Sequence, residues 1–113
     1  MIKQGAKIET SVGNGVLIFK LIGEIDHHNA KILRMQMDEK IILHRPQKTV
    51  LDLSHIDFMD SSGLGLIMGR YNTAKELGGV LVLRDPCKKV EKVLLLAGIE
   101  RFISVERSTK GVM

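Results

Sequence analysis

The sequence predicts an α/β fold, with one mixed, mostly parallel β-sheet that has an N-terminal β-hairpin at its edge and is covered by α-helices. Two observations predict it. Short aliphatic runs alternate along the chain with stretches of helical periodicity, and a glycine-rich tight turn separates the first two runs. Parallel strands need long crossover connections, which helices provide, whereas a tight turn joins antiparallel strands.

The hairpin comes first in the chain. Residues 16–22 (VLIFKLI) form a mostly apolar run bounded by glycines, which is typical of a largely buried strand. We expect residues 6–12 to pair with this strand across the turn formed by residues 13–15 (GNG).

A first crossover helix is expected after residue 26. Asp26 is a good N-cap residue, and Pro46 marks the end of the helix. Between them, apolar side chains recur at helical spacing: Ala30, Leu33, Met37 and Ile41. Residues 49–53 (TVLDL) then form a second buried strand.

A second helix follows the turn at residues 60–65, and residues 78–79 (GG) are a natural stop for it. Its apolar face consists of Leu64, Ile67, Met68, Tyr71, Ala74 and Leu77. Residues 80–83 (VLVL) are a third buried strand.

The last part of the chain predicts one more helix and one more strand. Asp85 and Pro86 are suited to the N-cap and first position of a helix that Gly98 closes. Residues 102–105 (FISV) are the expected final strand.

Composition limits the class of protein. The 113 residues are enough for one domain, residues 1–113, and the 44% hydrophobic and 27% charged residues are ordinary for a globular chain. The single Cys87 favours a reducing cytoplasm over an oxidising compartment. The N-terminus lacks the apolar core of a signal peptide, and no apolar run approaches the roughly 20 residues of a membrane span. We therefore expect a cytoplasmic protein that does not enter a membrane.

The formal net charge of +4 raises the question of nucleic-acid binding. The basic residues are dispersed, and the nearest thing to a cluster, Lys88, Lys89 and Lys92, is typical of a solvated helix face. We therefore expect no direct contact with nucleic acid. The sequence has no heptad repeat or extended apolar face that would indicate self-association, so the free protein is expected to be a monomer.

The most unusual segment is residues 60–65 (DSSGLG), at a strand-to-helix turn. Two glycines at the start of a helix cost stability unless the backbone needs close approach or open access. Asp60 or Ser61 can cap the helix, which is the favoured interpretation from these residues alone. A phosphoryl group on Ser61 or Ser62 could also be held at the positive helix start, and the two interpretations are compatible.

Catalytic and metal-binding interpretations fit the sequence less well. A nucleophile elbow needs Gly-x-Ser-x-Gly, but Met59 and Asp60 stand two positions before the two serines. A nucleotide-binding P-loop needs Gly-Lys-Ser/Thr, which is missing here. The adjacent His27 and His28 lack the three- or four-residue spacing of helical metal ligands, although either could serve as a base if a serine were a nucleophile.

Two separated motifs, in this order, resemble those of a known family. Residues 21–28 (LIGEIDHH) and 58–65 (FMDSSGLG), followed by residues 69–71 (GRY), closely resemble the STAS domain family in its branch of sporulation anti-sigma factor antagonists. The similarity covers nearly the whole chain, and the two motifs together are far more specific than either one. The resemblance implies a single STAS domain that is a regulatory binding module and kinase substrate, not an enzyme.

The resemblance also implies partners. The unphosphorylated domain would bind the anti-sigma factor kinase SpoIIAB and thereby release the sporulation sigma factor. That kinase itself holds ATP or ADP, so the domain would need no cofactor and no metal. The kinase would phosphorylate the first serine after the aspartate, which is Ser61 here. A PP2C-type phosphatase, SpoIIE, would remove the phosphate. The alternative is a related antagonist of a stress-response anti-sigma factor.

The same resemblance implies a partner-binding face. Asp26 would contact an arginine of the anti-sigma factor, and the residues expected to share this face are Gly23, Glu24, Asp26, Asp60, Ser61, Ser62, Gly63 and Leu64. One departure from some relatives is the short tail after Val105, residues 106–113, so a full C-terminal helix is not expected from the resemblance.

Overall fold

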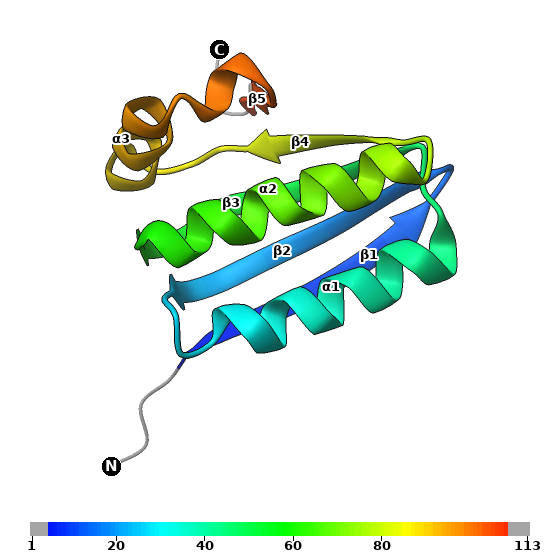
Figure 1. The fold of residues 1–113 in the computed structure, drawn as a ribbon, viewed down its shortest axis with the longest axis horizontal. Coiled ribbons are helices and arrows are strands. Elements are labelled where there is room, and N and C mark those ends of the chain that lie inside the picture. The colour runs from blue at the N-terminus through cyan, green and yellow to red at the C-terminus, as the bar shows by residue number, and fades with distance from the viewer. Residues whose placement is uncertain (1–4, 109–113) are drawn as a thin grey trace.

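The computed structural model describes residues 5–108. One sheet contains all the strands of this part of the chain, in the order in which they occur along the chain (Figure 1). The strands are β1 (Ala6–Gly13), β2 (Val16–Ile25), β3 (Lys48–Met59), β4 (Val80–Arg84) and β5 (Ser104–Glu106). Strand β1 pairs antiparallel with β2, and all other neighbours are parallel. The predicted mixed, mostly parallel sheet with an N-terminal hairpin at its edge is confirmed.

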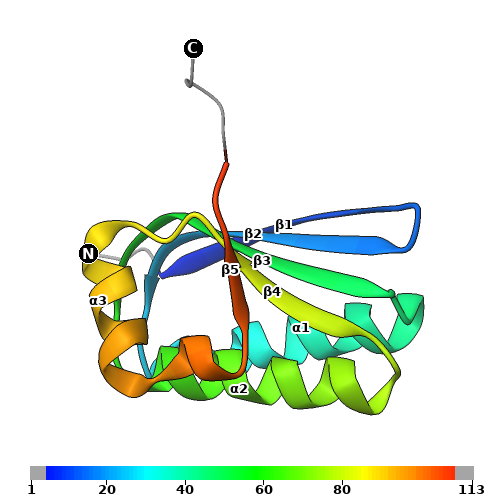
Figure 2. The ribbon, with the colours of Figure 1, turned by 90° about the horizontal axis from the view of Figure 1, so that it is seen from above.

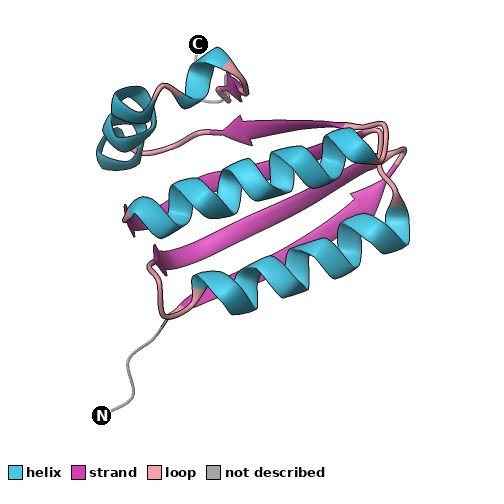
Figure 3. Ribbon diagram, in the orientation of Figure 1, coloured by secondary structure: helices cyan, strands magenta, loops and turns pink. Residues whose placement is uncertain are grey.

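Helices connect the parallel strands (Figure 3). They are α1 (Ala30–His44), α2 (Ser61–Glu76) and α3 (Lys88–Ala97), and a short 3₁₀ helix, η1 (Ile99–Arg101), precedes β5. Helices α1 and α2 lie side by side on one face of the sheet, while α3 lies at the end of the sheet where β2 and β3 finish (Figure 2). Within residues 5–108, no helix has the length and apolarity needed to cross a membrane.

The predicted hairpin turn is confirmed. Asn14 and Gly15 both have positive φ angles, 53° and 77°. Two positive φ angles in a two-residue loop give the twist that matches antiparallel strands, and Asn-Gly is the preferred pair for that conformation.

An aliphatic core joins the sheet to α1 and α2. In the first part of β2, alternate residues are fully buried in this core: Leu17, Phe19 and Leu21. The helices add the residues predicted from their periodicity, including Leu33, Met37 and Ile41 of α1 and Ile67 of α2. This packing fixes α1 and α2 against β2 and β3, so the loops that lead into both helices are held at the same end of the sheet (Figure 1).

The contact between α1 and α2 includes a buried charge. Arg70 is only 4% exposed, and its Nε lies 2.9 Å from Asp38 Oδ1. The atoms are close, but their orientation does not satisfy hydrogen-bond geometry, so the contact is an ion pair. Burial lowers the pKa of Arg70, the carboxylate of Asp38 opposes this shift, and the positive charge of Arg34 adds to it.

Several predicted boundaries were wrong. Strand β3 runs to Met59, beyond the predicted residues 49–53, because it stays paired with β2 through two irregularities in the register. Helix α3 begins at Lys88 with Cys87 as its N-cap, while Asp85 has a φ of 53° and its carboxylate accepts hydrogen bonds from Ser108.

The end of the chain differs in a similar way. The last strand starts at Ser104, because the backbone N–H of Phe102 closes the 3₁₀ turn on Ile99. Of the tail, residues 109–113 lie outside the described residues.

Candidate functional site

The sheet register brings the two sequence motifs together. Glu24 pairs with Phe58 and Ile25 pairs with Met59 in the parallel ladder of β2 and β3. Asp60, the residue directly after β3, donates its backbone N–H to the carbonyl of Ile25 over 3.2 Å. Both motifs therefore lie at the carboxyl ends of neighbouring strands, where open α/β sheets commonly carry their sites.

Asp26 shapes the loop between β2 and α1. Its carboxylate accepts hydrogen bonds from the backbone N–H groups of His28 and Asn29, over 2.9 and 3.2 Å. The prediction that Asp26 is the N-cap of α1 was wrong, because these bonds close a separate turn and the helix begins only at Ala30, with Asn29 as its N-cap. Asp26 stays half-buried beside this turn.

Gly23 and Glu24 form the bulge that leads into this loop. Gly23 has a φ of +112°, and a Cβ there would lie 2.4 Å from the carbonyl oxygen of Gly5. Any other residue would therefore both strain the backbone and collide with the chain just before β1. The carbonyl of Glu24 accepts a hydrogen bond of 2.8 Å from the side chain of Asn29. These two residues set the shape of the face predicted from the sequence.

Asp60 caps α2. Its Oδ1 accepts the backbone N–H of Ser62 over 2.7 Å, and its carbonyl accepts that of Gly63 over 2.9 Å. The capping interpretation of the turn is therefore confirmed for Asp60. Ser61 is the first residue of the helix and is exposed, while Ser62 is half-buried.

Gly63 is buried under the turn. A Cβ at this position would lie 2.1 Å from Met59 Cγ and 3.4 Å from Ile25 Cγ2. The missing side chain thus lets the first turn of α2 pack directly on the ends of β2 and β3. Gly65, two residues later, has open space around the same position.

This contrast gives a matched pair of variants. Gly63→Ala should lower the free energy of unfolding by about 1–3 kcal/mol, because an extra methyl group overpacks the site. Gly65→Ala should raise it by about 0.5–1 kcal/mol, because alanine is the better helix former and meets no obstacle. Urea unfolding of both variants measures the difference. Equal effects of the two changes would contradict a packing role for Gly63.

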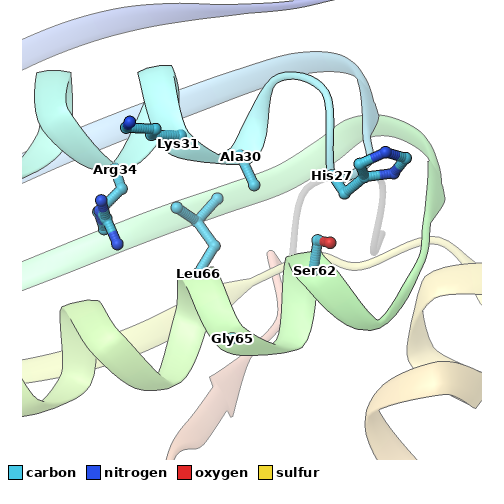
Figure 4. A pocket seen from close by; sticks show the side chains of 7 residues that line it. All are labelled: His27, Ala30, Lys31, Arg34, Ser62, Gly65 and Leu66. Carbon is cyan, nitrogen blue, oxygen red and sulfur yellow. The ribbon is translucent and has the colours of Figure 1, made fainter.

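The two serines of the turn face different grooves. One groove, here called the apolar groove, has a volume of about 420 Å³ and is lined by Met59, Asp60, Ser61, Leu64, Val93, Leu96 and Ala97. The other, here called the basic groove, has a volume of about 430 Å³ and is lined by His27, Ala30, Lys31, Arg34, Ser62, Gly65 and Leu66. Figure 4 shows the Ser62 hydroxyl on the side of α2 that faces His27, and Arg34 reaching from α1 toward α2.

The parts of this site that come from α1 and α3 were not predicted from the sequence. Leu96 is 83% exposed and Leu95 is 57% exposed, which is unusual for leucine. The run of residues 94–96 (LLL) was an available signal, because three consecutive leucines on a helix cannot all face the core. No comparable signal marked Lys31 and Arg34, since charged residues on a helix are ordinarily solvated.

The histidines do not form a ligand set with other residues. The rings of His27 and His28 lie against each other, with 4.0 Å between their centroids. Among residues 5–108, no group of three or more His, Cys, Asp or Glu side chains is placed to hold a metal ion.

Comparison with known proteins identifies a family and two relatives. The family model described as the STAS domain matches residues 7–111. An anti-sigma F factor antagonist from Paenibacillus polymyxa is 40% identical over 99 residues, which covers 88% of this chain and 85% of the relative. The anti-sigma-B factor antagonist of Bacillus subtilis (strain 168) is 29% identical over 93 residues, which covers 80% of this chain and 82% of the relative.

The fold is also similar to solved structures of the anti-sigma factor antagonist SpoIIAA. Its unphosphorylated form superposes with a TM-score of 0.79 at 25% identity, over 92% of this chain and 90% of that one. The phosphorylated form of the Bacillus protein superposes with a TM-score of 0.71 at 25% identity, over 94% and 93% of the two chains.

Proposed function

The chain belongs to the STAS domain family and is an anti-sigma factor antagonist, and from this premise we propose that it is a phosphorylation-gated switch of the sporulation type. In its unphosphorylated form it binds the anti-sigma factor kinase SpoIIAB in the cytoplasm and releases the sporulation sigma factor. Phosphorylation of Ser61 by that kinase ends the binding, and the PP2C-type phosphatase SpoIIE restores it.

One observation carries this proposal. The Asp26 loop and the Ser61 turn stand side by side at the ends of β2 and β3, joined by the hydrogen bond from Asp60 to Ile25. A partner that docks on this end of the sheet covers both motifs at once. Ser61 is exposed there and, among the described residues, its hydroxyl makes no hydrogen bond, so a kinase can reach it. That the structures similar to this fold include one of a phosphorylated form supports the same proposal.

Phosphate transfer tests the assignment directly. The protein is incubated with the cognate anti-sigma factor and ATP, and the modified residue is located by tandem mass spectrometry. We expect phosphate on Ser61 in the wild type and none in Ser61→Ala, whereas Ser62→Ala should still be modified. Phosphate found on Ser62 alone would overturn the assignment.

A second candidate function is the control of a stress-response sigma factor. The similarity to the Bacillus subtilis anti-sigma-B factor antagonist favours it, although the identity is lower than to the anti-sigma F relative, 29% against 40%. Titration of the protein against both kinds of anti-sigma factor separates the candidates. Tighter binding to the sporulation type supports the leading proposal.

A further inference from the structure

The basic groove has an excess of positive charge. Its lining includes the cations Lys31 and Arg34 and the imidazole of His27, and it includes no carboxylate. The aspartates of the two motifs line other grooves, Asp60 the apolar groove and Asp26 a groove beside Gly5. The acidic part of the candidate site and its basic part are therefore separate surfaces.

The cations of this groove are not neutralised by their neighbours. Asp38, one turn after Arg34 on α1, is already paired with the buried Arg70. Within the part of the chain that the structure describes, neither Lys31 nor Arg34 forms an ion pair. Arg34 also acts as a like charge on Arg70, whose pKa it lowers. A negative group from outside the chain would therefore be stabilised here.

Three of the backbone donors beside the groove are already used. The N–H groups of Ser62 and Gly63 bond to Asp60, and the N–H of Ala30 bonds to the carbonyl of Asp26. A phosphate group at a helix start is normally held by such N–H groups. The groove instead offers side-chain cations, a hydroxyl and the apolar surface of Leu66. That combination suits an acidic side chain, whose carboxylate pairs with the cations while its aliphatic part contacts Leu66.

The geometry points to the basic groove as a subsite for an Asp or Glu side chain of the anti-sigma factor, with Lys31 and Arg34 as its ion-pair partners. This inference rests on the proposed function, since it names a second contact of the same complex. Ser62 lines the basic groove and directly follows Ser61 in the chain. A partner that reaches Ser61 therefore also lies over the basic groove. On this inference two contributions to binding are separate: the motif residues form the serine turn, and Lys31 and Arg34 attract an acidic side chain of the partner.

A charge reversal at Arg34 tests the inference. Arg34→Glu should weaken binding of the anti-sigma factor about tenfold or more, because an attractive contact becomes a repulsive one. The loss should shrink as salt is raised from about 0.05 to 0.5 M, since ions screen exposed charges. The control is Lys7→Glu on β1, an exposed residue that changes the net charge equally, and its binding should match the wild type within about twofold. Removal of Arg34 also removes a like charge near Arg70, so the thermal midpoint of Arg34→Glu should not fall.

Carbodiimide cross-linking identifies the opposing group. The reagent activates a carboxyl group, and the Lys31 amine displaces the activating group to form an amide bond between the two chains. Mass spectrometry of the complex should find Lys31 joined to an Asp or Glu of the anti-sigma factor. Lys31→Arg should lose this cross-link while keeping wild-type affinity, because arginine keeps the charge but does not form the amide.

The outcomes separate the two proposals. If the wild type binds no anti-sigma factor, the proposed function fails and the subsite fails with it. If the wild type binds but Arg34→Glu binds equally well and Lys31 is not cross-linked, only the subsite is overturned. A third experiment adds ADP or ATP to the free protein and follows its NMR spectrum. Shifts confined to the amides of Lys31, Arg34 and Ser62 would show that the groove binds a nucleotide phosphate, and this would overturn the proposed carboxylate subsite.

Discussion

Ser61→Asp is expected to weaken the complex with the anti-sigma factor by about a hundredfold, which corresponds to about 2.7 kcal/mol of binding free energy. The added carboxylate would stand in the apolar groove, whose lining includes Leu64 and Leu96 and already carries the charge of Asp60. Docking removes water from this groove, and burying a charge without a partner costs several kcal/mol. A phosphoryl group adds about −1.5 to −2 charge and should have the larger effect, about a thousandfold.

A neutral variant of similar shape separates charge from size. Ser61→Asn has nearly the same dimensions as Ser61→Asp but carries no charge, so it should bind within about threefold to tenfold of the wild type. Ser61→Ala should bind like the wild type. Titration calorimetry at low and high salt measures all of them. If Ser61→Asn loses as much affinity as Ser61→Asp, steric exclusion and not charge explains the switch.

The loss should not come from unfolding. An acidic residue in the first turn of a helix is favourable by about 0.3–1 kcal/mol, because the helix start carries a partial positive charge. Ser61→Asp should therefore unfold at the same denaturant concentration as the wild type or a slightly higher one. A lower midpoint would show that the substitution disturbs α2 itself.

The second large effect is expected at the contact between α1 and α2. Asp38→Ala should lower the free energy of unfolding by about 3 kcal/mol, because it leaves the guanidinium of Arg70 buried without its ion-pair partner. Arg70 is almost fully enclosed, whereas Asp38 keeps about a third of its side chain exposed, 5% against 31%. For a domain of this size the change should lower the thermal midpoint by roughly 10 °C.

A double variant tests whether the buried charge of Arg70 causes the stability loss of Asp38→Ala. Asp38→Ala combined with Arg70→Met replaces the pair with apolar side chains, so it should be more stable than Asp38→Ala alone. Urea unfolding of the wild type, the two single variants and the double variant gives the coupling energy. A double variant that is as unstable as the sum of the single changes would show that Arg70 and Asp38 act independently.

The parts of the fold that the sequence predicted correctly are those set by local rules. The Asn14-Gly15 turn, the apolar periodicity of α1 and the stop at Gly98 each depend on residues within a few positions of one another. The wrong boundaries depend on side-chain bonds that periodicity and capping rules do not show, with a near neighbour at Asp26 and with a distant residue at Asp85. Asp26 looks like a helix cap until its loop is seen to be tied to Asn29 and Glu24, and Asp85 looks like one until Ser108 is found beside it.

The candidate site shows the same division. Asp60 was a natural cap in the sequence, and the structure agrees because its bond to Ser62 spans only two residues. The separation of Ser61 from Ser62 into two grooves depends on where α1 and α3 lie, which tertiary packing decides. The packing role of Gly63 could not be predicted from the sequence either, since it depends on the positions of Met59 and Ile25 beneath the helix.

The cap on α2 has a consequence for how the switch stores its state. Asp60 holds the helix start through the N–H of Ser62, and within residues 5–108 the hydroxyl of Ser61 makes no hydrogen bond. On the proposed function, a phosphate can be added or removed while the domain keeps one conformation. The two states then differ by a single covalent bond, the one between the phosphate and the Ser61 oxygen. On that function, the kinase and the phosphatase would set the lifetime of this bond, and no refolding step would separate the two states.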